Sequence, residues 1–382
     1  MSTTTIKRLK EEEEEEEEEL LRGLPDHLAQ LCLSRVPPAL LYSVCRPWRH
    51  LIYSASFPPF LSIYAILSSS SSSNNSSSSS CIGLFSFDPI SATWVPLPPP
   101  PPNPPLRLLL LRHPSFISRH LPVQSVSLSG HLLLLAATTH HLLPALSHPL
   151  VFHPISNQWR LGPPIPTPRR WCAAGSVGGA VYMASGVGAD YSAAVARRAE
   201  RWELEKKGWE GEWEKVAGMR DGRFSREAVE AVGLRGKLCM VNVKGDAAKE
   251  GAVYDVSRDE WEEMPEGMLA GWKGPAAALD ERVMYAVLEE EIGFGVLMVY
   301  DPDEGDEWGE VVRSEHLRGA GQIAAGGGRV CAVCSGGTAI VVVDVVAQPP
   351  RIWVLHPPPS KHVVSIHVLP RMSAHIATAT HS

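Results

Sequence analysis

Short runs of apolar residues, each ended by turn-forming residues, recur along the chain from about residue 60 to residue 370. Three run ends align without gaps and read FDPISATW at 87–94, FHPISNQW at 152–159 and YDVSRDEW at 254–261. In the first, Asp88 can cap its own backbone and Pro89 presets φ, which is the chemistry of a tight turn. Each segment therefore predicts a β-hairpin in which an apolar strand turns into a short outer strand that carries the tryptophan.

The tryptophans of this pattern recur with a period that settles near about 50 residues, which is typical of a repeat architecture. They are Trp94, Trp159, Trp213, Trp261, Trp308 and Trp353. A second kind of hairpin precedes most of them: a strand of small residues, usually a glycine-containing turn, and a strand rich in Val and Tyr or other apolar residues. Its copies begin at Val126, Cys172, Ala228, Ala276 and Ile323.

Two such hairpins make a four-stranded sheet, and sheets repeated around an axis make a β-propeller. Small residues suit the innermost strand, where backbones converge. We therefore predict a mainly β protein with a six-bladed propeller. A β-sandwich is the alternative, but it has no need of the same turn six times.

The repeated unit resembles the kelch repeat. Gly178-Gly179-Ala180-Val181-Tyr182 and the Tyr254-Asp255 pair ahead of Trp261 match its pattern. Residues 279–282 lack the glycine pair, the loop before Trp353 is stretched, and the unit at 202–213 carries a charged insertion. The resemblance implies a kelch-like propeller over residues 57–370.

The end of the chain supplies one more strand-like run, 363–369, after the last tryptophan unit. The first blade, at 61–97, is short of strands. We expect the C-terminal run to join that blade and close the ring, which removes the exposed sheet edges.

The N-terminal region has helical rather than strand spacing. After Pro25, apolar residues stand at 28, 31, 32 and 33, and Pro37-Pro38 ends the pattern. A second short helix is expected over 39–45 and a third from Trp48. This predicts a small α-helical module over residues 20–56.

The module resembles an F-box, because Leu24-Pro25 and Val44-Cys45-Arg46-Pro47-Trp48 occupy the positions of its opening and closing motifs. Its middle segment is short, and Pro47 stands where the last helix should begin. The resemblance implies binding to a Skp-type adaptor, and through it to a cullin. The residues to which it gives contact roles are Leu24, Pro25, Leu28, Leu31, Val44, Cys45 and Trp48. The alternative is a helical hairpin that only packs on the propeller.

The charge of the chain is concentrated in one run. The formal net charge is −7, but Glu11 to Glu19 hold nine acidic residues, and the rest of the chain has 35 basic and 33 acidic residues, a balance of +2. No basic stripe suggests nucleic-acid binding.

We interpret 1–19 as a solvated acidic tail, 68–80 as a Ser-rich loop inside the first blade, 96–105 as a Pro-rich connector with an SH3-type ligand as the alternative, and 371–382 as a C-terminal tail.

The sequence contains no run of 18 apolar residues, and its N-terminus does not resemble a signal peptide. The seven cysteines are scattered, which fits a reducing compartment without a disulfide framework. We expect a cytoplasmic or nuclear protein with no membrane partner.

Signatures of catalysis are weak. Cys331 and Cys334 have zinc-like spacing but no second pair nearby, and the stretch 174–178 lacks the first glycine of a nucleophile elbow. The histidines at 140, 141, 148 and 153 could bind a metal, although a solvated loop is favoured. We expect no catalytic residue, metal or cofactor, with a propeller enzyme as an alternative class.

The sequence therefore predicts the substrate-recognition subunit of an SCF-type ubiquitin ligase, whose propeller binds a target protein. The alternative is a kelch-type interaction scaffold without a ligase role. Aromatic and arginine side chains ahead of inner strands are candidates for target binding, with packing between blades as their alternative role. They are Arg169, Arg170, Trp171, Arg223, Phe224 and Trp272.

Overall fold

The computed structural model describes residues 20–34, 36, 38–53, 61–69, 82–89, 91–101, 123–139, 143–204, 211–225, 228–243, 250–290 and 293–371. The interpretations of 1–19 and of 372–382 lie outside these residues, as do most of 68–80 and the end of the run 96–105.

Three helices form the N-terminal module: α2 (Asp26–Leu33), α3 (Pro38–Val44) and α4 (Arg46–Tyr53). Pro25 precedes α2 with an extended backbone, φ −55° and ψ 140°. The third helix begins at Arg46, two residues earlier than predicted, because a proline in the first helical turn has no hydrogen bond to lose. Pro47 is therefore part of the helix rather than a barrier to it.

The strands of the described residues form six four-stranded antiparallel sheets, so the predicted six-bladed propeller is confirmed. The strands of each blade are given from the innermost outward. Blade 1 consists of β24 (Lys361–Pro370), β1 (Leu61–Ser69), β2 (Ile82–Asp88) and β3 (Thr93–Pro96), and blade 2 of β4 (Val123–Leu128), β5 (His131–Ala137), β6 (Leu150–His153) and β7 (Gln158–Leu161). Blade 3 consists of β8 (Ala173–Val177), β9 (Ala180–Ala184), β10 (Ala199–Glu203) and β11 (Glu214–Val216). Blade 4 consists of β12 (Ala228–Leu234), β13 (Lys237–Val243), β14 (Gly251–Asp255) and β15 (Glu260–Glu263), and blade 5 of β16 (Ala276–Leu279), β17 (Val283–Glu289), β18 (Gly295–Tyr300) and β19 (Trp308–Ser314). Blade 6 consists of β20 (Gln322–Gly326), β21 (Arg329–Cys334), β22 (Ala339–Asp344) and β23 (Arg351–Leu355).

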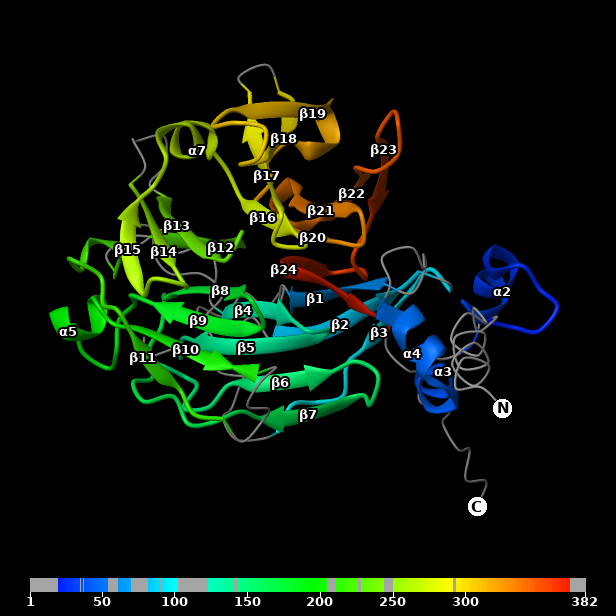
Figure 1. Cartoon of the computed structure of the whole chain (residues 1–382), viewed down its shortest axis with the longest axis horizontal. Coiled ribbons are helices and arrows are strands. Elements are labelled where there is room, and N and C mark those ends of the chain that lie inside the picture. Colours follow the sequence, from blue (N-terminus) through cyan, green and yellow to red (C-terminus); the bar gives the residue numbers. More distant parts are fainter. Residues whose placement is uncertain are drawn as a thin grey trace, which may run out of the picture.

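The C-terminal strand closes the ring as predicted. β24 pairs antiparallel with β1 from Leu61 opposite Pro370 to Ser69 opposite Lys361, and the two lie side by side near the centre of Figure 1. The Tyr64 hydroxyl donates to the Pro370 carbonyl at 2.8 Å. Because this pairing continues through Ser69, the strand extends two residues into the segment that was predicted to be a loop.

The hydrophobic core lies between blades rather than within them. Each of six buried clusters takes side chains from two adjacent blades, as when Leu133 and Val151 of blade 2 pack with Val181 of blade 3. A single blade cannot bury its faces alone, so the fold depends on the repetition.

The repeated tryptophans join neighbouring blades. Four of them pack, with tilted rings, on the aromatic residue opposite them in the ladder, with ring centroids 5.1 to 5.4 Å apart. The same four indoles donate to a carbonyl that follows the outer strand of the preceding blade, at 2.7 to 3.1 Å. The pairs are Trp94 with His356, Trp159 with Pro98, Trp261 with Ala217 and Trp308 with Met268.

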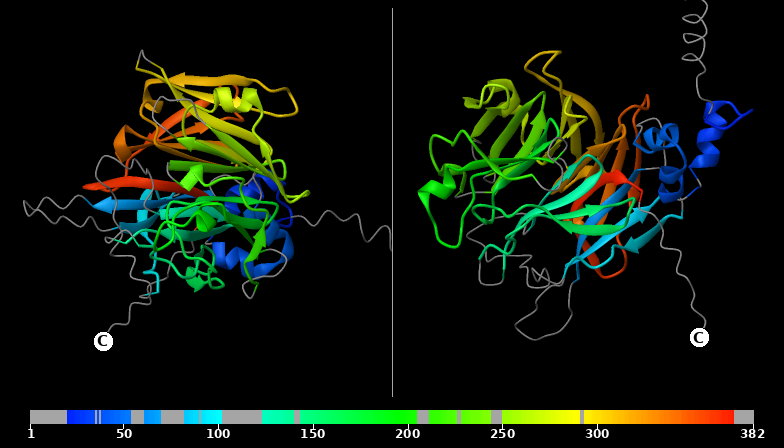
Figure 2. Two further views of the ribbon diagram at one scale, coloured as in Figure 1. Left: turned by 90° about the vertical axis from the view of Figure 1, so that its left-hand side faces the viewer. Right: turned by 60° about the horizontal axis from the view of Figure 1, so that its bottom comes forward.

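The strand directions sort the connections onto two opposite faces. The tight turns between first and second strands, and the turns between third and fourth strands, form what we call the turn face. The connections between second and third strands and between blades form the loop face. In Figure 1 the helices α2 to α4 lie at the right, beside the turn face, and α5 (Ala193–Ala196) of the loop face lies at the left. Figure 2 shows the helical module beside the propeller from two further directions.

Candidate functional site

The helical module is held together by a small core of its own. Leu33, Leu41 and Leu51 are buried together with Ile155, which lies in the turn between β6 and β7. The module therefore packs on the turn face of the propeller through blade 2. This contact places the module away from the loop face.

A second set of apolar side chains on the same helices points outward. In α2 and the turn before it, Leu24, Leu28 and Leu31 are 38%, 42% and 61% exposed. In α3, Leu40 and Val44 are 52% and 58% exposed. Their spacing of three or four residues puts the members of each helix on one side. We call these five residues the helical apolar patch.

The other predicted adaptor contacts have different surroundings. Pro25 is exposed beside the patch, and Cys45 is half-buried. Trp48 is half-buried against the core of the module, and its indole donates to the Leu20 carbonyl at 2.9 Å. Trp48 therefore holds the first residues of the module in place and is not a member of the patch. Leu40 is a member that the sequence analysis missed, although it stands four residues before Val44.

Four of the predicted target-binding residues are buried between elements. Arg169, Phe224 and Trp272 are 1%, 5% and 0% exposed and Arg170 is 9% exposed, so packing between elements describes their surroundings better than surface anchoring. Arg169 forms an ion pair with Glu200, which is 3% exposed, and donates to the carbonyls of Ser185 and Arg198 at 3.1 and 3.2 Å. A buried charge pair of this kind is costly to break from one side.

The buried Arg170 and the other two candidates, Trp171 and Arg223, lie on the loop face. Arg223 is exposed and forms ion pairs with Asp221 and Glu250. The Arg170 guanidinium lies over the Trp171 ring, 4.6 Å from its centroid, and donates to the Gly188 carbonyl at 2.6 Å. Trp171 is half-buried and stands at the end of a channel along the propeller axis.

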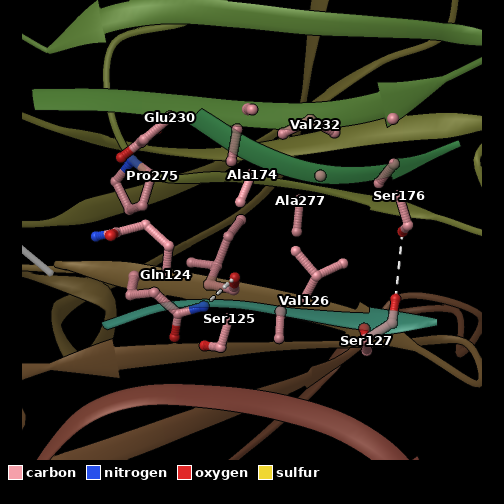
Figure 3. Close-up of a pocket in the computed structure, with 18 of the residues that line it drawn as sticks. Gln124, Ser125, Val126, Ser127, Ala174, Ser176, Glu230, Val232, Pro275 and Ala277 are labelled. Carbon is pink, nitrogen blue, oxygen red and sulfur yellow. Dashed lines mark hydrogen bonds between the residues drawn. The ribbon is translucent and has the colours of Figure 1, made fainter. Parts of the chain in front are cut away.

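The channel is lined by the six innermost strands and has a volume of about 250 Å³. Small residues such as Ala174, Ala231 and Ala277 form much of its wall, as the sequence pattern predicted for inner strands. Figure 3 shows Gln124 and Glu230 toward one end, near Pro275, and Ser127 and Ser176 toward the other. Because Pro275 belongs to a connection between blades, the end with Glu230 opens on the loop face.

Polar contacts around the channel tie neighbouring elements together. The Ser125 hydroxyl and the His367 Nε2 atom are 2.8 Å apart, and burial lowers the pKa of His367 to about 4. The Gln322 amide accepts from the Ile366 N–H at 2.9 Å. The Trp272 indole donates to a Glu230 carboxylate oxygen at 3.3 Å. Glu230 was missed by the sequence analysis, although an acidic residue within a small-residue strand was a visible signal.

The residues with weak signatures of catalytic or metal chemistry lie in buried strands or pack on neighbouring side chains. Cys331 and Cys334 lie in β21, the second strand of its blade, and burial raises the pKa of both thiols to about 12. Ser176 is in strand β8, not at a strand-to-helix turn. His153 packs on His131 with ring centroids 4.6 Å apart, and burial with the neighbouring His131 lowers its pKa to about 4.

Within the ranges given above, no group of three or more His, Cys, Asp and Glu side chains is arranged to hold a metal ion. None of the helices found there is long and apolar enough to cross a bilayer.

These features define a six-bladed propeller with an N-terminal helical module that exposes several large apolar side chains. Over 386 aligned residues the chain is 50% identical to the F-box/kelch-repeat protein SKIP25 of Arabidopsis thaliana, and the alignment covers 98% of this chain and 96% of that protein. The chain therefore belongs to the F-box/kelch-repeat family, which confirms the resemblance found in the sequence.

Other relatives agree with this assignment. The F-box protein AFR of Arabidopsis thaliana is 25% identical over 349 residues, covering 83% of this chain and 82% of that protein. No family model matches the sequence. Among solved structures, TolB from Acinetobacter baumannii aligns with a TM-score of 0.50 at 10% identity, over 82% of this chain and 68% of that one, a likeness of fold alone.

Proposed function

We propose that this protein is the substrate-recognition subunit of an SCF-type cullin-RING ubiquitin ligase. The helical module binds a Skp-type adaptor, and through it a cullin, while the propeller binds a target protein. The chain itself carries out no covalent step, because the ubiquitin transfer belongs to other subunits. This role places the protein in the cytoplasm or the nucleus.

The observation that carries the proposal is the helical apolar patch. Leu24, Leu28, Leu31, Leu40 and Val44 are exposed on two short helices whose opposite sides already have a core. Exposed apolar clusters of this kind mark protein interaction sites, because water contact with them is unfavourable. The names of the relatives, F-box and F-box/kelch-repeat proteins, support the same role.

The proposed contacts follow from exposure. Leu24, Leu28, Leu31 and Val44 supply the apolar surface, with Leu40 added to the predicted set, and Pro25 and Cys45 border it. Trp48 supports the module from inside. Burying one leucine side chain at an interface contributes about 1.5 to 3 kcal/mol, so a charge in its place should weaken binding strongly.

The test is a pull-down of the full chain with a purified Skp-type adaptor. Wild type should retain the adaptor, and the double variant Leu28→Arg/Leu31→Arg should lose at least about tenfold in affinity, since two buried contacts disappear. Leu161→Arg is the matched control, because Leu161 is also an exposed leucine, 47% exposed, on the outer strand β7. This control should bind like wild type.

The pull-down also distinguishes the proposed ligase subunit from the alternative, a kelch-type scaffold. A kelch-type scaffold without a ligase role would retain no adaptor in the wild-type sample, and that result would overturn the proposal. Because the substituted leucines are exposed, thermal unfolding should be nearly unchanged in both variants, which shows that a loss of binding is not a loss of fold.

A further inference from the structure

The last of the six repeated tryptophans is out of phase with the others. In blades 1, 2, 4 and 5 the tryptophan pairs with the aromatic residue that precedes the turn. The pairs are Trp94 with Phe87, Trp159 with Phe152, Trp261 with Tyr254 and Trp308 with Tyr300. In blade 6 Ile352 takes that ladder position, and Trp353 follows it, opposite Val342. Because successive side chains of a strand point to opposite faces, Trp353 lies on the other face of its blade.

This shift of one residue moves Trp353 to the seam between blades 6 and 1. Ile352 packs in the core cluster between blades 5 and 6, whereas Trp353 lines a pocket of about 240 Å³ between blades 6 and 1. Figure 1 shows β20 to β23 of blade 6 next to β24 and β1 of blade 1. Trp353 is 37% exposed, and Leu61 and Arg329 begin strands at the turn face, so the pocket opens there. We call it the seam pocket.

The wall of the seam pocket is largely apolar. Both blades contribute large side chains to it: Leu61, Phe87 and Val368 from blade 1, and Val342, Trp353 and Leu355 from blade 6. The Ser62 hydroxyl in this wall already donates to the Phe87 carbonyl. Burial raises the pKa of the Cys331 thiol, which also lines the pocket, to about 12, so it carries no charge near neutral pH. An apolar cavity of about 150 Å³ can hold a benzene ring, so the seam pocket has room for a ring with a short chain.

Among the described residues that line the seam pocket, the one with a charged side chain is Arg329. Its guanidinium lies over the Trp353 ring, 6.0 Å from the ring centroid. In the part of the chain that the structure describes, this guanidinium makes no ion pair. Asp344 stands opposite Arg329 in the ladder, but its carboxylate accepts instead from the N–H groups of Val346 and Ala347, both at 3.2 Å.

The equivalent position in blade 4 has a cation whose charge is compensated. Lys237 begins β13 as Arg329 begins β21, and it stands opposite Asp255. Its Nζ atom forms ion pairs with Asp255 at 3.4 Å and with Glu262 at 3.0 Å. In blade 6 Trp353 occupies the ladder position of Glu262, so a ring replaces the second carboxylate. The N–H donors of Arg329 are therefore available to a carboxylate that a ligand supplies.

We propose that the seam pocket binds a small apolar molecule that carries one carboxylate, with its apolar body against Trp353 and Phe87 and its carboxylate on Arg329. Arginine can hold a carboxylate through two parallel N–H···O bonds, and apolar walls strengthen the attraction. Asp88, which follows Phe87, is paired with Arg371 at 2.7 Å, so its charge is compensated. The inference does not depend on the ligase role, and none of the described lining residues belongs to the helical apolar patch.

The test titrates 3-phenylpropionate into the full chain labelled with ¹⁵N at tryptophan. Two compounds with the same apolar body serve as comparisons, the neutral 3-phenylpropionamide and the cationic 3-phenylpropylamine. The Trp353 indole resonance, identified by its loss in Trp353→Phe, should shift saturably with the acid at a Kd below about 1 mM, and the amide should bind at least about tenfold more weakly. The amine should bind more weakly still, because it brings a like charge to Arg329. Added salt should weaken the acid but not the amide.

Variants locate the charge partner. Arg329→Gln removes the charge, so it should weaken the acid at least about tenfold and leave the affinity for the amide unchanged, which shows that the pocket itself is intact. Arg351→Gln is the matched control, because Arg351 is an exposed arginine at the turn-face end of the same blade and is not among the described lining residues. It should bind the acid like wild type. The comparison of acid, amide and amine on wild-type protein keeps the test valid if a variant does not fold.

Several results would overturn the inference: no Trp353 shift with about 10 mM acid, equal affinity for acid and amide, or unchanged affinity for the acid in Arg329→Gln. A blocked dipeptide, acetyl-Phe-Asp-amide, is titrated in parallel. Binding of the dipeptide without binding of the free acid would mean that the pocket takes a segment of a protein instead of a small molecule. Failure here leaves the adaptor pull-down untouched, so the two proposals fail separately.

Discussion

Single polar side chains connect elements that are far apart in the chain. His367 of the last strand contacts Ser125 of β4 at 2.8 Å, and both are on the channel wall. Asp306 accepts from the Tyr300 hydroxyl at 2.8 Å and from the Gly267 N–H at 2.9 Å, which links blade 5 to the segment before it. Such bonds contribute about 1 kcal/mol each and are directional, so they help to set the register between blades.

The buried His367 makes the stability depend on pH. Its pKa is about 4 in the folded protein against an ordinary 6.5. In the unfolded chain the His367 side chain therefore takes up a proton at about pH 6.5, whereas in the folded protein it does so only at about pH 4. The stabilisation is complete above about pH 6.5 and is lost as the pH falls toward about 4, by up to about 3 kcal/mol.

Denaturant unfolding followed at several pH values between about 7.5 and about 4 checks this prediction. His367→Gln should show a smaller loss of unfolding free energy across that window than wild type, because one titrating group is gone. His316→Gln, at an exposed position, should keep the wild-type slope. A slope in His367→Gln equal to that of wild type would contradict the assignment.

At the scale of strands and helices, one element can take part both in strand pairing and in core packing. β24 is the clearest case, because the last strand of the chain is the innermost strand of the first blade. Val363, Ile366 and Leu369 are buried at its two neighbouring seams, between blades 6 and 1 and between blades 1 and 2. The strand thus contributes to two core clusters as well as to the pairing that closes the ring.

Deleting residues 361–382 should remove the closure. Three buried aliphatic side chains contribute about 5 to 9 kcal/mol together, a large part of a typical unfolding free energy. We expect the melting temperature to fall sharply, or the cooperative transition to disappear, in differential scanning calorimetry. A shorter deletion of 372–382 keeps β24 and the ion pair of Arg371 with Asp88, and it should melt like wild type. An unchanged melting curve in the longer deletion would refute this role of β24.

At the scale of the whole molecule, the propeller separates the two surfaces to which binding is proposed. The helical module rests on the turn face through Ile155, which is 6% exposed in the core that it shares with Leu33, Leu41 and Leu51. The seam pocket with Arg329 lies between blades 6 and 1. The adaptor contact and the acid pocket therefore depend on different blades, so each can be tested without the other.

Ile155→Lys should loosen the module from the propeller while leaving both folded. The substitution places a charge among apolar side chains, so backbone amides of α2 to α4 should exchange hydrogen about 30-fold faster, equivalent to about 2 kcal/mol. The melting transition of the propeller should change little. Hydrogen exchange with mass spectrometry measures both regions. Leu161→Lys, on the exposed side of the same blade, is the control, and equal exchange in the two variants would show that Ile155 does not hold the module.

The repeat, the turns and the helices could be predicted because their signals are local. The step of six residues from Asp88 to Trp94 recurs from His153 to Trp159 and from Asp255 to Trp261, and turn residues act within a few positions of the chain. The C-terminal closure was also predictable, since the first blade at 61–97 was short of strands and a strand-like run at 363–369 followed the last tryptophan unit. The sequence by itself thus determined the family, the number of blades and the class of the N-terminal module.

Only the tertiary structure decided which of the candidate side chains face water. Arg169, Phe224 and Trp272 resemble surface anchors in the sequence but are covered by neighbouring elements, and Trp48 turns into its own module. Glu230, in a strand that looked purely structural, lies instead at an open channel. The physical reason is that exposure depends on residues supplied by other blades and other helices. Those neighbours are distant in the chain, so no local pattern of apolar and polar positions contains them.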